Sequence, residues 1–393
     1  MSDPFPITNG VKQGCVLAPT LFSMVFSAML QDSCQNNSTG INIIYRFDGG
    51  LFNLRRLQAK TKVEEVTVCE LLFADDCALV ASSNEELQAS MDLFSSACNN
   101  FGLTISTKKT EVLYQPAPGK PYTEPTILVN NQKLSAVDKF TYLGSTLSRA
   151  VHIDDEVNIR IGKASAAFGR LRDSVWARNG IRQETKLKVY EAVVLPTLLY
   201  GCETWTVYQR HARKLNHLHL SCLRKLLRIK WQDRIPDTEV LSKANLPSIH
   251  TLLATAQLRW TGHVTRMPCT RLPKQAFFGE LESGKRAQGG PKKRYKDTLK
   301  SSLKSFKIDL NRWEHLAKDR PAWRRKVQEG AVHCENSRRS SATLKRQQRK
   351  AKKETVPAPQ SSASSLTCPE CHREFRARIG LFSHLRTHQK STH

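Results

Sequence analysis

The spacing of four metal-binding side chains near the C-terminus constrains this chain more than any other feature of its sequence. Two residues separate Cys368 from Cys371, and three separate His384 from His388. The first gap suits a tight turn that points both thiolates at one ion, and the second places two imidazoles on one face of a helix. Because zinc prefers such a set of thiolates and imidazoles, we expect a tetrahedral zinc site.

A segment this short needs the metal in order to fold. Phe375 and Leu381 lie between the two ligand pairs and are placed to form its only core. Metal binding supplies on the order of 10 kcal/mol or more to such units. Residues 367–390 resemble the two-Cys, two-His zinc-finger family along their whole length, and this resemblance implies a small ββα fold.

We expect this finger to bind nucleic acid with little choice of sequence. If its helix begins at Arg378, the side chains that face the bases are those of Ala377, Gly380 and Ser383, which cannot make bidentate base contacts. Five basic side chains favour phosphates instead, and these are Arg373, Arg376, Arg378, Arg386 and Lys390. A sequence-specific transcription factor, the third class of function that the finger allows, is therefore disfavoured.

The positive charge of the chain is concentrated in its second part. The 393 residues contain 61 Lys and Arg against 35 Asp and Glu, a formal net charge of +26. Residues 1–150 hold only 12 of these bases and 14 of these acids, so the whole surplus lies downstream. Such a surplus indicates a polyanionic partner, and we expect RNA, DNA or both rather than an anionic membrane.

Cysteine spacing and apolar stretches indicate a reducing compartment and no membrane span. Among the eleven cysteines only Cys368 and Cys371 form a close pair, so no disulfide framework is expected. The longest apolar stretch, residues 17–30, is interrupted by Ser, Thr and Ala and is shorter than the roughly 20 residues that a membrane helix needs. We interpret this stretch as a buried helix.

Two adjacent carboxylates lie in the middle of an apolar segment. Residues 66–81 are rich in Val, Leu and Phe around Asp75 and Asp76, which predicts a β-hairpin with both aspartates at its tip. Taken alone, the pair has two interpretations, ordinary turn residues or ligands for a divalent cation. The segments around the hairpin decide between these interpretations.

The remaining periodicity predicts an α+β fold that becomes helical downstream. Ser83 and Glu86 form a capping box for a helix that ends at Gly102. From about residue 154 the apolar residues recur at helical spacing. Strands and helices of this length in the first 150 residues are typical of a layered α+β structure.

Four signatures in this order resemble the later palm motifs of reverse transcriptases from non-LTR, LINE-like retrotransposons. They are residues 10–19 (GVKQGCVLAP), 73–76 (FADD), 102–103 with 109–111 (GL and KTE) and 140–144 (FTYLG). The downstream segments 200–205 (YGCETW) and 262–267 (GHVTRM) resemble the less conserved remainder of such elements, in the RTE-like group. The resemblance covers nearly the whole chain, and its first 145 residues carry the specific part.

The resemblance implies roles for five residues. Asp75 and Asp76 match the paired carboxylates that hold magnesium while a primer 3′-hydroxyl attacks a nucleotide. Gln13 and Gly14 match a turn that lies against the nascent base pair, and Lys109 matches a lysine near the leaving phosphates. A solvated surface lysine is the alternative interpretation of Lys109, and the sequence leaves it open.

The resemblance and the charge pattern together predict the domain organisation. It comprises a partial reverse-transcriptase palm (1–148), a helical thumb (149–235), a basic helical C-terminal region (236–330), a basic disordered linker (331–366) and the zinc finger (367–390). Residues 338–353 carry eight bases and no acid and are not expected to fold alone. This basic stretch is either a solvated linker or a nuclear-import signal, and the second interpretation makes the nucleus the expected location, with the cytoplasm as the alternative.

The resemblance also implies parts that the sequence does not match. The family has an earlier palm strand with another metal-binding aspartate, and fingers that hold the nucleotide, whereas nine residues precede Gly10 and Asp3 does not fit that strand. We therefore expect an N-terminally truncated RNA-directed DNA polymerase that binds nucleic acid and zinc but is inactive alone, with a complementing polymerase fragment as partner. The alternative is a non-catalytic zinc-finger protein that binds nucleic acid and derives from such an element.

Overall fold

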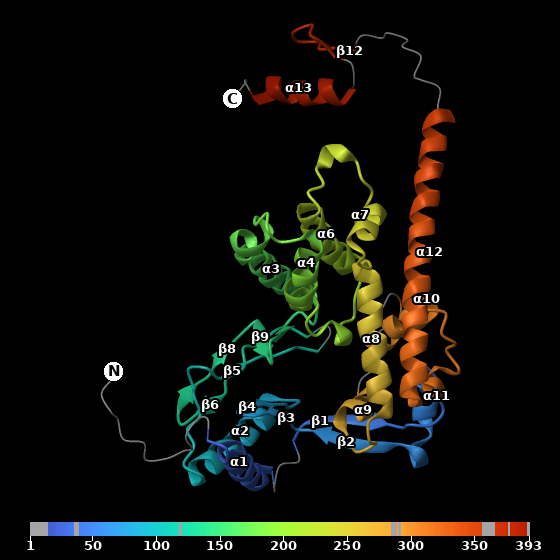
Figure 1. The fold of residues 1–393 in the computed structure, drawn as a ribbon. Coiled ribbons are helices and arrows are strands. Elements are labelled where there is room, and N and C mark those ends of the chain that lie inside the picture. The colour runs from blue at the N-terminus through green and yellow to red at the C-terminus, as the bar shows by residue number, and fades with distance from the viewer. Residues whose placement is uncertain are drawn as a thin grey trace. The chain divides into compact units, whose positions relative to one another are not determined.

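The computed structural model describes residues 15–34, 39–117, 120–283, 289, 292–355, 366–375 and 378–390. These residues fall into two compact units, Met1–Ser337 and Arg338–His393, which are considered separately below. The described elements confirm the expected mixture of helices and small sheets (Figure 1). Among them, no helix combines the length and the apolar character that crossing a bilayer requires.

Two helices pack together near the start of the first unit. Helix α1 (Ala18–Cys34) lies against α2 (Asn84–Asn100), and the side chains of Met29, Ala97 and Cys98 form their shared core. The predicted cap of α2 is confirmed, because the backbone N–H of Glu86 donates to the Ser83 hydroxyl at 3.2 Å. The Glu86 carboxylate accepts from the Ser82 N–H rather than from that of Ser83.

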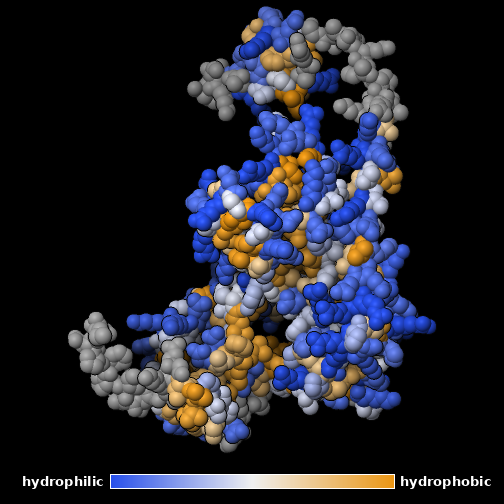
Figure 2. All heavy atoms as spheres, in the orientation of Figure 1, coloured by the Kyte–Doolittle hydropathy of each residue, from blue (hydrophilic) through white to orange (hydrophobic). Residues whose placement is uncertain are grey.

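The interpretation of residues 17–30 as a buried helix was wrong. Helix α1 exposes large apolar side chains, including Met24 (65% exposed), Val25 (46%) and Leu21 (44%). The stretch is apolar on more sides than α2 alone can cover, so the side turned away from α2 remains open to solvent. Figure 2 shows this apolar surface as an orange area over α1.

Short antiparallel hairpins follow the two helices. Strands β3 (Glu70–Phe73) and β4 (Asp76–Leu79) form the predicted hairpin, and β9 (Lys139–Tyr142) pairs with β10 (Ser145–Ser148). The smaller pairs are parallel β5 (Glu111–Val112) with β8 (Ser135–Ala136), and antiparallel β6 (Leu128–Val129) with β7 (Gln132–Lys133). Their apolar side chains pack on α2 around the fully buried Ile127.

Residues 41–68, called the excursion below, leave this region and join elements more than two hundred residues later in the chain. Strand β1 (Ile41–Tyr45) pairs on one edge with β2 (Glu64–Val68) and on the other with β11 (Glu280–Leu281). The connection between β1 and β2 inserts Leu51, which is fully buried, into a core formed by residues 258–327. In Figure 1 these strands lie beside the helices of the later region.

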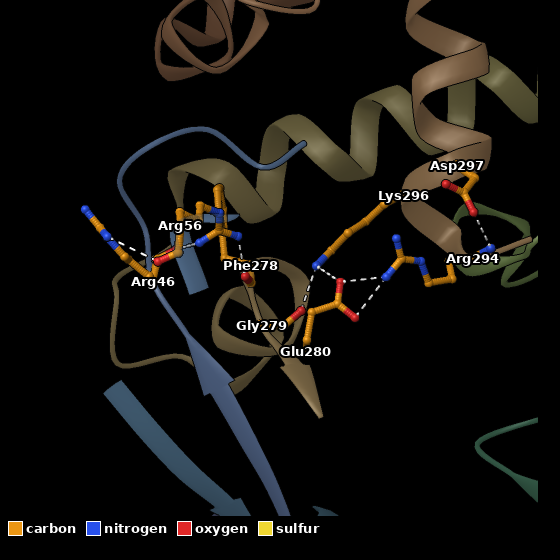
Figure 3. A network of polar contacts seen from close by, with 8 residues as sticks. All are labelled: Arg46, Arg56, Phe278, Gly279, Glu280, Arg294, Lys296 and Asp297. Carbon is orange, nitrogen blue, oxygen red and sulfur yellow. Dashed lines mark hydrogen bonds and ion pairs between the residues drawn. The ribbon is translucent and has the colours of Figure 1, made fainter. Parts of the chain in front are cut away.

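Buried polar contacts hold this excursion in place (Figure 3). The Arg56 guanidinium donates to the carbonyl oxygen of Phe278 at 2.5 Å and also to the carbonyl oxygen of Arg46. Next to it, the Glu280 carboxylate accepts from Lys296 at 2.9 Å and from Arg294 at 3.2 Å. The contacts of Glu280 join β11 to the start of α10. The hydrogen bond from Arg56 to Phe278 connects the excursion to the later residues, and it holds the excursion there because burying a cation without a partner is costly.

A helical bundle forms the middle of the first unit. Its helices are α3 (Asp154–Arg170), α4 (Gln183–Val189), α5 (Leu195–Leu198), α6 (Gln209–Leu226) and α7 (Asp237–Ala244), with a π-helical turn (Tyr190–Val194) between α4 and α5. The predicted apolar stripe of α3 is buried at Val157 and Ala164. Tyr190 and Leu215 are also buried completely, so the bundle has its own core.

A second helical layer follows the bundle. It comprises α8 (Ile249–Arg266), α9 (Leu272–Phe278), α10 (Tyr295–Ser305), α11 (Trp313–Lys318) and the start of α12 (Arg320–Thr355). Leu258, Trp313 and Trp323 lie at the centre of its core, together with Leu51 from the excursion. The first unit therefore has a core that combines an early and a late part of the sequence.

The expectation of a disordered linker at 331–366 is corrected for residues 331–355, which continue α12. Lys, Arg, Gln and Ala have high helix propensity, and the packed turns around Trp323 and Val327 already supply the nucleus from which a helix extends at low cost. The side chains of residues 340–351 are exposed. Residues 356–365 lie outside the described part of the chain.

The second unit ends in a ββα arrangement. Strand β12 (Leu366–Thr367) pairs with β13 (Glu374–Phe375), and α13 (Arg378–Lys390) packs on both strands. These elements follow the order that the resemblance to two-Cys, two-His zinc fingers implies.

Candidate functional site

The aspartate pair lies at a tight turn between β3 and β4. Phe73 pairs with Asp76, so Ala74 and Asp75 form the two-residue turn. Ala74 has a φ of +52°, a left-handed conformation that costs a residue other than glycine about 1–2 kcal/mol. Asp75 and Asp76 are both exposed. Strain of this kind directly beside exposed carboxylates is a common feature of functional turns.

A second hairpin is attached to the first through one tyrosine. The Tyr142 hydroxyl donates to the carbonyl oxygen of Leu71 at 2.8 Å and lies 3.3 Å from that of Asp76. Burial raises the pKa of Tyr142, and the nearby Cys77 and Asp76 raise it further, so its hydroxyl keeps its proton. The structure therefore brings together two of the four signatures, residues 73–76 and 140–144.

A buried ion pair fixes the second hairpin on the helical bundle. Arg160 and Glu156 on α3 have side chains only 6% and 4% exposed and are 2.7 Å apart. The second carboxylate oxygen of Glu156 accepts from the Thr146 N–H at 2.8 Å, and Arg160 also donates to the carbonyl oxygen of Gly144. The Arg160 guanidinium stacks over the ring of Tyr200 at 4.4 Å. The helical pattern of the sequence places Arg160 off the apolar stripe, so its burial was missed.

Of the other residues with predicted roles, the structure describes only Lys109. Gln13 and Gly14 lie outside the described residues. Lys109 is exposed in a turn, where its backbone N–H donates to the carbonyl oxygen of Ser106 at 3.0 Å. Among the described contacts, none links the Lys109 side chain to Asp75 or Asp76, and both interpretations of this lysine remain open.

Within the described ranges, one group of three or more His, Cys, Asp or Glu side chains converges closely enough to hold a metal ion. It is the C-terminal Cys and His cluster, so the described residues place no third ligand beside Asp75 and Asp76. Two carboxylates on one turn can contribute oxygen ligands to a divalent cation, but fixing two such ions requires further acids.

The four predicted zinc ligands do come together. The ligand atoms of Cys368, Cys371, His384 and His388 all lie within 4.8 Å of one another. The His384 Nε2 atom is 3.0 Å from the Cys371 sulfur and 3.0 Å from the His388 Nε2 atom. Phe375 packs against the His384 ring at 4.8 Å, as expected for a residue of the small core. Two thiols and two imidazoles in this arrangement fit tetrahedral zinc.

The surroundings of the cluster favour ligand ionisation and orientation. Desolvation opposes ionisation of the Cys368 thiol, but hydrogen bonds from the backbone N–H groups of Cys371 and Glu370 outweigh it and lower the pKa of Cys368. His388 Nδ1 lies 3.1 Å from a carboxylate oxygen of Glu370. Such a contact orients the imidazole so that its Nε2 atom faces the other ligands.

Comparison with known proteins identifies the first part of the chain. Residues 2–147 match the reverse transcriptase (RNA-dependent DNA polymerase) family. The chain is 24% identical over 242 residues to the RNA-directed DNA polymerase from mobile element jockey of Drosophila melanogaster. It is 26% identical over 234 residues to the retrovirus-related Pol polyprotein from type-1 retrotransposable element R2 of Popillia japonica. The chain contains a LINE-like reverse-transcriptase domain.

The relatives differ in how much of their own length this chain matches. The jockey alignment covers 60% of the chain and 23% of that polymerase, and the R2 alignment covers 57% and 28%. A putative uncharacterized transposon-derived protein of Caenorhabditis elegans is 26% identical over 274 residues, which are 67% of this chain and 96% of that protein. The LINE-like relationship is confirmed, and the RTE-like subgroup remains a prediction.

Proposed function

We propose that this chain is part of a retrotransposon RNA-directed DNA polymerase and that the 393-residue polypeptide does not extend primers on its own. The observation that carries this proposal is the exposed turn that contains Asp75 and Asp76. Tyr142 joins this turn to the second hairpin, and no third carboxylate of the described residues converges on it. The reverse-transcriptase domain supports the ancestry, and the isolated carboxylate pair supports the lack of activity.

The reason is geometric. Asp75 and Asp76 are the residues that would hold magnesium, which neutralises charge on the attacking and leaving oxygens of nucleotide addition. Both come from one turn, so their carboxylates approach the cation from one side only. We infer that a complementing polymerase fragment supplies the remaining acids.

Primer extension with the purified polypeptide tests this proposal. On a primed RNA template with magnesium, extension is expected to be no greater than that of the Asp75→Ala variant. The proposal would be contradicted if the wild-type chain extended the primer and the Asp75→Ala variant did not, because such activity would require a complete metal site within this polypeptide.

We also propose that the chain binds zinc through its C-terminal cluster and binds RNA or DNA through its basic second part. The ligand geometry supports the first, and the charge surplus downstream of residue 150 supports the second. Each neutralised phosphate changes the slope of log affinity against log salt by about −0.9 on duplex and about −0.7 on single strands. Fluorescence anisotropy should give a slope of several units, mostly lost on deletion of residues 338–393. A flat response to salt would exclude nucleic-acid binding.

A second candidate is a non-catalytic nucleic-acid-binding protein. The nematode relative favours this candidate. The match covers 96% of that protein, and its name describes it as transposon-derived. The sequence that flanks the gene separates the two candidates. An in-frame upstream strand that carries another aspartate favours the polymerase, whereas a genuine promoter directly before Met1 favours the binding protein.

A further inference from the structure

An arginine-lined cleft of about 500 Å³ lies between α8 and the start of α12 in the first unit. Helix α8 contributes Arg259, His263 and Arg266, which follow helical spacing along one face. Helix α12 contributes Arg320 and Arg324, while Trp323 forms part of the lining. Two helices therefore turn their basic faces toward one hollow, and the surface around the start of α12 is hydrophilic (Figure 2).

Among the residues that the structure describes, no carboxylate lines the cleft. Within the described part of the chain, none of its four guanidinium groups forms an ion pair; Arg266 donates to the carbonyl oxygen of Ala317 at 2.6 Å. The nearest acid in sequence, Asp319, accepts a hydrogen bond from the Ala322 N–H at 3.3 Å. Burial lowers the pKa of Arg266, and the positive charge of Arg320 lowers it further, which shows how closely the cations are gathered. A bound anion would reduce the electrostatic repulsion between these cations.

Tight packing holds the two helices of the cleft together. The Trp323 indole N–H donates to the carbonyl oxygen of Leu258 at 3.0 Å. Gly262 faces the same indole so closely that a Cβ at this position would lie 2.2 Å from Trp323 Nε1. The cleft is therefore preorganised, and binding an anion would require little rearrangement of its backbone.

We propose that this cleft binds the phosphate groups of a nucleic-acid backbone. The inference rests on the proposed function, in which the basic second part of the chain binds RNA or DNA. Guanidinium groups bind phosphate through paired hydrogen bonds, and several of them in one cleft suit a chain of phosphates better than one small anion.

A pair of matched double variants of the full chain tests the proposal. In the cleft variant, Arg259→Gln and Arg324→Gln remove two exposed cations of the lining. In the control, Arg312→Gln and Arg325→Gln remove two exposed cations outside the lining, so the net charge of the two proteins is equal. Anisotropy titrations use a labelled duplex and a labelled single strand over a range of salt concentrations. Circular dichroism melts verify that both variants fold.

The cleft variant is expected to lose about tenfold or more in affinity, with a salt slope on duplex shallower by about 2, while the control stays near the wild type. If both variants bind alike while the wild type keeps a steep salt slope, the cleft proposal fails and the proposed function stands. If the wild type shows no salt dependence, both fail.

A further comparison separates backbone binding from capture of a free or terminal phosphate. The same strands are titrated with and without a 5′-phosphate, and inorganic phosphate is added as a competitor. The proposal is supported if the cleft variant loses the same affinity for strands with a 5′-phosphate as for strands without one. Affinity that depends on the terminal phosphate, or that millimolar inorganic phosphate abolishes at constant ionic strength, overturns it.

Discussion

The Tyr142 hydroxyl lies 2.8 Å from the carbonyl oxygen of Leu71, which is 71 residues earlier in the chain. This hydrogen bond joins the aspartate hairpin to the hairpin of residues 140–144, which Glu156 and Arg160 in turn fix on α3. The candidate catalytic turn is thereby connected to the helical bundle through a short series of polar contacts. Each contact in the series can be removed by a single substitution.

Tyr142→Phe should loosen the aspartate hairpin without removing its ring packing. Loss of one hydrogen bond costs about 1 kcal/mol, so hydrogen exchange of the amides of residues 70–79 should become about fivefold faster. Tyr114→Phe is the control, because the described contacts of Tyr114 are ring contacts with Tyr122. Equal exchange in both variants would show that the Tyr142 hydroxyl does not support the hairpin.

Glu156→Leu should destabilise the bundle strongly, because it leaves the Arg160 guanidinium buried without its partner. Breaking a buried pair in this way costs about 3–5 kcal/mol, measured by urea unfolding followed through tryptophan fluorescence. The exposed pair of Glu239 and Lys243, each about half exposed, provides the comparison. Glu239→Leu should cost less than about 1 kcal/mol, and a similar cost at both sites would refute the structural role of the buried pair.

Acid should destabilise the bundle through His219. Burial lowers the pKa of His219 to about 4, outweighing contributions of the Pro247 backbone and Glu335 that raise it, while the Tyr190 hydroxyl contacts its Nδ1 atom at 2.8 Å. The ordinary pKa is 6.5, so below that pH the unfolded state binds a proton that the folded state does not. Stability should therefore fall as the pH drops from about 6.5 to about 4, by roughly 3 kcal/mol in total.

The variant His219→Gln should remove this contribution to the pH dependence of urea unfolding. His217→Gln changes an exposed histidine on the same helix and should leave the wild-type dependence unchanged. A wild-type protein that is equally stable at pH 7 and pH 4.5 would contradict the prediction.

Cys371→Ala should abolish zinc binding and unfold the finger. Metal binding supplies most of the folding free energy of such a small unit, so removal of zinc by a chelator should have the same effect. Cobalt substitution gives a tetrahedral absorption band that reports on the site. His372→Asn changes a neighbouring histidine that is not among the four converging groups, and it should keep that band. Retention of the band in Cys371→Ala would disprove the ligand assignment.

Local patterns in the sequence predicted local structure well. The capping residues Ser83 and Glu86 gave the correct start of α2, and the apolar strands around Asp75 gave the correct hairpin. The Cys and His spacing predicted the convergence of the four side chains, and the resemblance to two-Cys, two-His zinc fingers implied the ββα order. In each of these cases the deciding interactions connect residues that are close in the sequence.

Long-range packing was not predictable in the same way. Nothing in the local pattern around Leu51 indicates that it enters a core formed by residues 258–327. The burial of Arg160 depends on the Gly144 carbonyl group and the Tyr200 ring, which a helical stripe cannot reveal. The arginine cleft did leave a signal, since Arg259 and Arg266 share one helical face, but only the structure shows that α12 faces them.

The distance along the chain between Arg56 and Phe278, 222 residues, has a consequence for synthesis. At about 5–20 residues per second, a ribosome needs roughly 10–45 s to make the late strand after the early one has emerged. During that interval β1 can pair with β2, but its other edge has no β11 to pair with, and Leu51 in the connection to β2 has no core to enter. The early excursion can complete its fold only after most of the polypeptide has been translated.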